Sequence, residues 1–251
     1  MKKQTNLIIS YVFVIVCSAV VTISSIISSK TSGYIPAATD GIFVFGCSGI
    51  LINLLFPLIL VYSTLYKLRL DFDPVYVVRR KSKIDMWNRV FLYSYAVCLI
   101  AVFTSMVVSG IITLLYTQKW KYTGMESILY GEFMKTGYTM PPKFHYGIMF
   151  VISLFINSAE VFVRVLISLG IYWFTESQVF TIIMIIVMRI FLDGRMSKYF
   201  ALWRYRVEGG AYYTELCSGA RTIESILYML IPIVFIELLA YICIPRKNFY
   251  K

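Results

Sequence analysis

The chain has 251 residues, of which 59% are hydrophobic and 15% are charged, and its mean hydropathy is +0.75. A soluble domain of average composition is about 45–50% apolar and about 25% charged, so the composition excludes a water-soluble fold, a disordered chain and a disulfide scaffold. The 24 basic and 13 acidic side chains give a net charge of +11, which in so apolar a chain indicates basic loops beside anionic lipid rather than nucleic-acid binding. The composition predicts a polytopic membrane protein.

Six apolar stretches meet or approach the length of a membrane-spanning helix. Crossing the hydrocarbon core takes about 20 mostly apolar residues, and we therefore expect an all-α fold that forms a single transmembrane domain over residues 1–251. The predicted spans are 6–27, 41–66, 87–116, 147–174, 179–192 and 223–244.

The first stretch follows two lysines, as a signal peptide does. Its apolar run is longer than the apolar region of a typical signal peptide, and no A-x-A cleavage site follows it. We expect it to be a retained helix.

The second stretch carries Asn53 and Pro57 near its middle, and Pro232 lies inside the sixth. Proline frees a backbone carbonyl and kinks a helix, which membrane proteins tolerate where neighbouring helices or a cavity satisfy the freed group. Kinks of this kind suit a structure that opens and closes, and they also occur as packing features.

The segment between the second and third stretches is basic. Asp73 followed by Pro74 is a good N-cap and first-turn pair for a helix, and Arg79, Arg80 and Lys83 would share one face of that helix. We expect a short amphipathic helix at the inner membrane surface. It would serve either as a basic anchor on lipid or as a lever that docks on a cytoplasmic partner.

The run from Arg79 to Lys83 also sets the predicted orientation. It is the tightest basic cluster in the chain, and basic residues gather in cytoplasmic loops. We therefore expect a cell-membrane protein with both termini in the cytoplasm.

Charged side chains occur inside three of the apolar stretches. Glu160 and Arg164 are four residues apart, so they share one helix face and can form an ion pair. Such a pair is either a self-neutralised structural feature or part of a solvated translocation path. Glu237 would meet Arg189 across a helix interface, reach water at the inner boundary, or take part in transport.

The fifth stretch is short and leaves the topology of segment 194–222 open. With six full spans this segment lies outside. If the fourth and fifth stretches form one kinked or re-entrant unit, it is cytoplasmic.

Motifs for catalysis are missing from the sequence. It contains no P-loop, no H-E-x-x-H and no G-x-S-x-G, and its five cysteines form no metal-like pair. With a single histidine, His145, we expect neither an enzyme nor a bound metal or other cofactor.

The layout resembles the membrane subunits of ABC-2 type exporters, particularly small permeases of Gram-positive bacteria. Such permeases have six spans in about this length, and an aliphatic-then-basic run followed by Trp connects spans two and three, matched here by 77–83 and Trp87. A longer outer segment precedes their last span, here 193–222, and a short basic-aromatic tail closes them, here 246–251.

The resemblance implies that two permeases pair, as identical or homologous copies, and that each docks a separate P-loop ATPase through the loop around Asp73 to Trp87. ATP-driven closure of the ATPases would then release an amphipathic peptide or a hydrophobic small molecule outward. The ATPase-coupling residues implied by the resemblance are Asp73, Arg79, Arg80, Lys81, Lys83 and Trp87. The candidate residues for the translocation path are Asn53, Glu160, Arg164, Arg189 and Glu237.

Two other classes compete with this hypothesis. One is an ion-coupled secondary transporter that uses the acidic and basic side chains of the spans as a relay, although the inverted repeats typical of such folds are not evident. The other is a non-transporting membrane protein, such as an immunity protein, an assembly factor or a lipid-acting enzyme. The expected partners are membrane lipid, the ATPase and a second permease copy or homologue, and we expect no nucleic-acid partner.

Overall fold

The computed structural model describes residues 2–71, 83–120, 128, 146–192 and 222–243. In these residues the backbone is helical apart from short turns, and no strand occurs among them, which confirms the predicted all-α class for this part of the chain. The helices are α1 (Lys2–Thr31), α2 (Ala38–Asp40), η1 (Gly41–Phe45), η2 (Leu51–Leu55), α3 (Phe56–Asp71), α5 (Lys83–Thr117), α7 (Tyr146–Thr175), α8 (Gln178–Leu192) and α10 (Thr222–Cys243).

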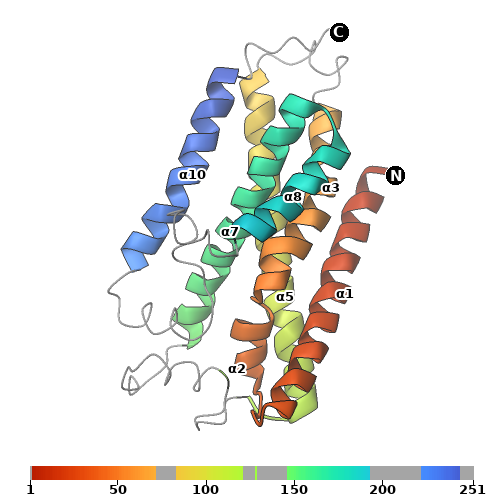
Figure 1. The fold of residues 1–251 in the computed structure, drawn as a ribbon, viewed down its shortest axis with the longest axis vertical. Helices are drawn as coiled ribbons and strands as arrows, with labels where there is room; N and C mark the ends of the chain where they lie inside the picture. The colour runs from red at the N-terminus through yellow and green to blue at the C-terminus, as the bar shows by residue number, and fades with distance from the viewer. Residues whose placement is uncertain (1, 72–82, 121–127, 129–145, 193–221, 244–251) are drawn as a thin grey trace.

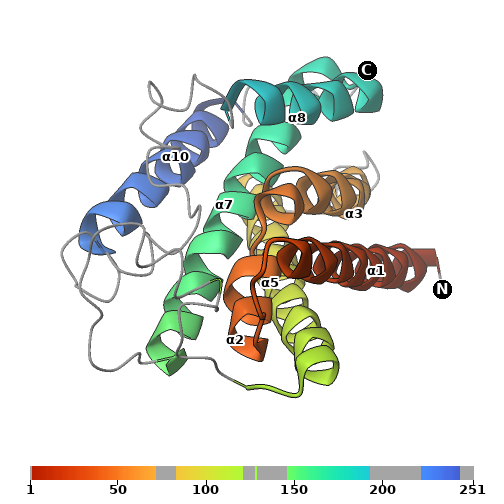
Figure 2. The ribbon, with the colours of Figure 1, turned by 60° about the horizontal axis from the view of Figure 1, so that its bottom comes forward.

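The long helices form an elongated bundle with α5 at its centre (Figures 1 and 2). Helix α5 packs against α1, α3 and α7, and also against the short elements α2 and η1. Successive helices run in alternate directions. As a result, the N-terminal ends of α1 and α5 and the C-terminal ends of α3, α7 and α10 gather at one end of the bundle (Figure 1).

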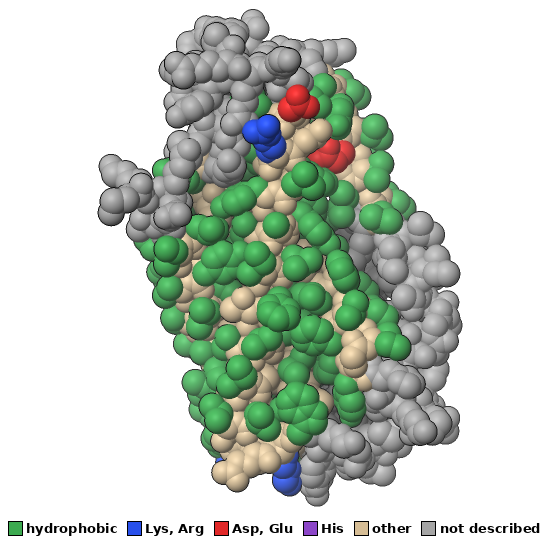
Figure 3. Space-filling model, turned by 180° about the vertical axis from the view of Figure 1, so that it is seen from behind, with side chains coloured by type: hydrophobic (Ala, Val, Ile, Leu, Met, Phe, Trp, Pro, Cys, Tyr) green, Lys and Arg blue, Asp and Glu red, His purple; other side chains and the backbone are tan. Residues whose placement is uncertain are grey.

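Three helices are long and apolar enough to cross a membrane: Leu7–Thr31, Ile84–Thr117 and Tyr146–Thr175. The other apolar helical segments are shorter, at Leu51–Tyr66, Gln178–Arg189 and Ile233–Ile242. One face of the bundle carries hydrophobic side chains along nearly its whole length, and the charged side chains of described residues on it lie close to its two ends (Figure 3). An apolar surface of this extent indicates a membrane protein, because it would be unfavourable in water.

The second apolar stretch is not the continuous helix that its hydropathy predicts over 41–66. Its helix has a π turn at η1, is broken at residues 46–48, and has a second π turn at η2 before it continues as α3. In both π turns an amide donates to the carbonyl five residues before it, from Gly46 to Gly41 and from Phe56 to Leu51. Widened turns of this kind are rare and are frequent at functional sites.

Helix α8 turns back sharply after α7. Glu176 has a φ of 55°, and its amide donates to the carbonyl of Tyr172 (2.8 Å), which ends α7. Ser177 then caps α8 by accepting the amide of Phe180 (3.3 Å). The predicted fourth and fifth stretches are therefore two helices joined by a tight turn, and they do not form one kinked helix.

Small residues let the broken helix approach α5 closely. A Cβ added at Gly41 would lie 2.5 Å from the carbonyl oxygen of Ser109, and one at Gly46 would lie 2.9 Å from the Cα of Met106. From the other side, a Cβ at Gly110 would lie 2.6 Å from the side chain of Ile42. Backbone-to-backbone packing at small residues is the usual way in which helices associate in lipid.

Candidate functional site

The irregular backbone of the second apolar stretch places carbonyl groups beside other helices. A buried polar group without a hydrogen bond is costly, and in a membrane there is no water to supply one. Three such carbonyls, at Gly46, Gly49 and Asn53, accept hydrogen bonds from side chains of three other helices.

The carbonyl of Asn53 cannot receive the usual α-helical hydrogen bond, because residue 57 is proline. In an α-helix the amide of residue 57 would donate to the carbonyl of residue 53, but proline has no amide hydrogen. Arg164 of α7 takes its place, because its Nη1 donates to the Asn53 oxygen at 3.4 Å. Arg164 is 1% exposed and is the largest fully buried side chain among the described residues.

Of the other two carbonyls, that of Gly46 lies at the start of the break and that of Gly49 directly follows it. Arg189, near the end of α8, donates from Nη1 to the Gly49 oxygen at 3.1 Å. Ser105 of α5 donates from Oγ to the Gly46 oxygen at 2.8 Å. Two guanidinium groups and a hydroxyl thus reach the broken helix from α5, α7 and α8.

The predicted ion pair between Glu160 and Arg164 is present. Arg164 Nη2 lies 3.2 Å from Glu160 Oε1, and the carboxylate side chain is 14% exposed. One guanidinium therefore neutralises a carboxylate on its own helix and binds a backbone carbonyl on another. We call these contacts the helix-break cluster; its members are Gly46, Gly49, Asn53, Ser105, Glu160, Arg164 and Arg189.

The polar face of α7 continues beyond the helix-break cluster. Asn157 Nδ2 donates to the Ser153 carbonyl at 2.7 Å, and the Ser153 hydroxyl lies 3.7 Å from the thiol of Cys47. Asn157, Ser153 and Cys47 are all buried. Polar residues at 153, 157, 160, 164 and 168 recur every three or four residues, so this face was visible in the sequence, although only 160 and 164 were singled out.

Glu237 forms a separate polar contact. Its Oε1 accepts a hydrogen bond from Trp87 Nε1 at 3.1 Å, and one turn further along α10 the Tyr241 hydroxyl lies 3.2 Å from Asn88 Nδ2. Both contacts tie α10 to α5. Arg189 was one partner predicted for Glu237 from the sequence. In the structure, Glu237 accepts its hydrogen bond from the indole of Trp87.

Most predicted ATPase-coupling residues lie outside the described part of the chain, namely Asp73, Arg79, Arg80 and Lys81. Lys83 is the first residue of α5. The ring of Trp87 is buried, at 3% exposed, and stacks edge-to-face on Trp173 with ring centroids 5.9 Å apart. Its surface is therefore occupied by helix packing.

The sequence analysis missed Asp40, which lies one residue before the predicted second span. The side chain is fully buried, and its Oδ2 accepts the amide of Ala37 at 2.8 Å. Asp40 supplies only the acidic half of a capping box, because Ala37 has no side-chain oxygen, so the sequence lacks the usual S/T-x-x-E/Q signature that would have located it.

In the helix-break cluster, side chains of three helices donate hydrogen bonds to backbone carbonyl oxygens of an interrupted helix. Within the described residues no group of three His, Cys, Asp or Glu side chains could hold a metal ion. The buried cysteines Cys47 and Cys98 carry free thiols. The geometry is that of a polar centre that connects α5, α7 and α8 to an interrupted helix.

Comparison with protein families and with known proteins gives no relative. The chain matches no family model, no curated protein and no solved structure. Fold and site together define an α-helical membrane protein with a polar centre inside its helix bundle.

Proposed function

We propose that this chain is the membrane permease subunit of an ABC exporter. It would have six membrane segments, with α8 as the short fifth, and both termini in the cytoplasm. A separate P-loop ATPase would hydrolyse ATP. The exported substrate would be an amphipathic peptide or a hydrophobic small molecule.

The helix-break cluster is the observation that carries this proposal. Charged side chains within membrane helices are costly, and they typically face the interior of a bundle and mark transport pathways. Interrupted helices with irregular backbone are tolerated at membrane depth where they are buried in protein or line a cavity. Here Arg164 and Arg189 bind the carbonyls of an interrupted helix, which supports a segment that can change conformation during transport.

The ends of the helices also support the proposed coupling site. The C-terminal end of α3 and the N-terminal end of α5 lie at the same end of the bundle as the N-terminal end of α1 (Figure 1). The basic run 79–83 follows α3 and ends at the first residue of α5. The segment 72–82 joins α3 to α5 in the chain, so an ATPase that binds it would dock close to α5, the central helix of the bundle.

The test is co-purification from the native membrane followed by an ATPase assay. We expect the tagged chain to retain a P-loop ATPase, and we expect the double charge reversal Arg79→Glu/Arg80→Glu to abolish that retention. Like charges at the docking surface would repel an ATPase that binds the basic cluster. If the basic run acts in docking alone, the thermal stability of the purified chain should stay unchanged.

The matched control reverses two basic residues that the sequence predicts on the opposite side, Lys119→Glu/Lys121→Glu. This variant should retain the ATPase as the unaltered chain does. Recovery of an active chain that transports without any ATPase would contradict the proposal, and transport driven by an ion gradient would indicate a secondary transporter instead. Loss of the ATPase in both double variants would show that the net charge of the chain, and not the basic run 79–83, governs the association.

A further inference from the structure

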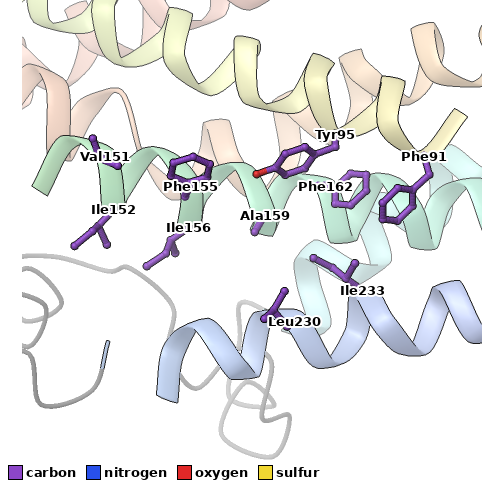
Figure 4. Close-up of a pocket in the computed structure, with 10 residues that line it drawn as sticks. All are labelled: Phe91, Tyr95, Val151, Ile152, Phe155, Ile156, Ala159, Phe162, Leu230 and Ile233. Carbon is purple, nitrogen blue, oxygen red and sulfur yellow. The ribbon is translucent and has the colours of Figure 1, made fainter. Parts of the chain in front are cut away.

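Helix α10 is tied to the bundle along one half of its length. Its main packing partner is α7, and its contacts with α5 include the hydrogen bonds from Trp87 to Glu237 and from Asn88 to Tyr241. Earlier in α10, Leu230 and Ile233 face α5 and α7 across an open space (Figure 4). Helix α10 is therefore held against α5 near its C-terminal end and is separated from α5 at Leu230 and Ile233.

That space is an apolar groove of about 520 Å³. Side chains of α7 form its floor, α5 contributes Phe91 and Tyr95 on one side, and α10 contributes Leu230 and Ile233 on the other (Figure 4). The Tyr95 hydroxyl is the one polar side-chain group among the ten lining residues, which are Phe91, Tyr95, Val151, Ile152, Phe155, Ile156, Ala159, Phe162, Leu230 and Ile233.

Three aromatic rings close one end of the groove. Phe162 meets Phe91 edge-to-face with ring centroids 4.9 Å apart, and it meets Tyr95 in the same way at 5.2 Å. Edge-to-face contacts of this kind are favourable and hold rings in place. An occupant that enters along α7 would end against this aromatic cluster.

The surroundings of the groove determine what reaches it. Val151 and Phe155 of α7 and Leu230 of α10 are 46–51% exposed, and α7 is one of the three helices that can cross a membrane. In a membrane, lipid acyl chains would therefore contact this surface. The ten described lining residues carry no charged group, and their apolar side chains favour an apolar occupant.

The size of the groove selects among apolar occupants. A helix with its side chains is about 10–12 Å wide and rises about 5.4 Å per turn, which corresponds to roughly 500 Å³ per turn. A groove of 520 Å³ has about the volume of one turn of a peptide helix, so it would admit side chains of a neighbouring helix but not the helix itself. A flexible hydrocarbon chain needs no such width and can follow the length of the groove.

We propose that the groove between α5, α7 and α10 binds one acyl chain of a bilayer phospholipid. The chain lies along α7 with its methyl end against Phe91, Tyr95 and Phe162, and it fills the space that keeps α10 apart from α5. This inference does not depend on the proposed export function, because lipid binding here requires neither the ATPase nor a substrate.

The experiment uses the full chain in phosphatidylcholine nanodiscs that contain a phosphatidylcholine with a photoreactive diazirine near the end of one acyl chain. After illumination, peptide mass spectrometry locates the adducts. We expect adducts on the groove residues Phe155, Ala159 and Leu230 to exceed those on Ile100 of α5 several-fold, although Ile100 is 47% exposed. Ile100 lies between Tyr95 and Phe103, which contact α7 at Phe162 and Phe150.

Ala159→Trp places a large ring in the groove and should reduce the groove adducts several-fold, whereas Ile148→Trp on the exposed face of α7 should leave them unchanged. Ala159→Leu fills less space and should give an intermediate reduction, which keeps the test decisive if the tryptophan variant does not fold. Equal labelling of all lipid-facing residues would overturn the proposal. So would an absence of adducts on the groove residues, which would show that a second copy or another segment of the chain covers the groove.

Discussion

Replacing Arg164 with leucine is expected to lower the free energy of unfolding by about 3–5 kcal/mol, the usual cost of removing one partner of a buried ion pair. The change leaves the Glu160 carboxylate, which is 14% exposed, without its cation, and it removes the donor to the Asn53 carbonyl. Thermal unfolding or SDS titration of the purified protein in detergent measures the loss.

Two further variants separate the charge effect from the carbonyl effect. Glu160→Gln retains a neutral acceptor for Arg164 and should cost less than Arg164→Leu. The double variant Glu160→Gln/Arg164→Leu should be more stable than Arg164→Leu alone, because no unpaired carboxylate remains. If Arg164→Leu changes the stability by less than about 0.5 kcal/mol, the effect of a surface substitution, the buried pair is not an energetic centre of the fold.

Gly41→Ala is expected to have the second-largest effect, a loss of about 1–3 kcal/mol typical of overpacking. The added Cβ would collide with Thr113 Oγ1 and would lie 2.5 Å from the carbonyl oxygen of Ser109. The carbonyl belongs to the backbone of α5 and cannot rotate away. Helix α5 and the broken helix would have to move apart, which the same unfolding measurements detect.

Gly170→Ala in α7 is the matched control. A Cβ at Gly170 meets no atom within 4 Å, and alanine is favoured over glycine inside a helix by up to about 1 kcal/mol. This variant should be as stable as the unaltered chain or slightly more stable. Equal stability of Gly41→Ala and Gly170→Ala would show that the close approach of the two helices is not rigid.

Hydropathy predicted the extent of the helices well. The stretch expected at 147–174 is α7, Tyr146–Thr175, and the one expected at 223–244 is α10, Thr222–Cys243. Helix ends follow the point where apolar residues give way to turn formers and charges, and this signal is local. The membrane crossing itself is supported by length and composition for three of the helices, and the six-span topology stays a prediction.

The break in the second stretch was only half visible. Asn53 and Pro57 indicated a kink, but the backbone departs from regular helix already at Gly41 and breaks at residues 46–48. The cause is not local: Gly41 and Gly46 permit close packing on α5, and carbonyls of the broken helix accept hydrogen bonds from distant parts of the chain. Hydropathy carries no information about such contacts.

The candidate site was predicted in part for the same reason. Glu160 and Arg164 pair within one helix turn, so their spacing was sufficient to predict the contact. The partners of Arg189 and Glu237 are Gly49 and Trp87, which lie 140 and 150 residues away along the chain. Pairings at such separations depend on how the helices pack, and one sequence does not specify that packing.

The central claim is that Arg164 replaces the backbone amide that Pro57 lacks. A double-mutant cycle between Pro57→Ala and Arg164→Leu tests it most directly, carried out in a Glu160→Gln background so that no carboxylate is left unpaired. Alanine restores an amide that can donate to the Asn53 carbonyl, so Arg164→Leu should then cost less, by about 0.5–1.5 kcal/mol, the net value of one hydrogen bond. If the two substitutions are additive within about 0.3–0.5 kcal/mol, as independent sites are, Arg164 does not serve the Asn53 carbonyl and the account is contradicted.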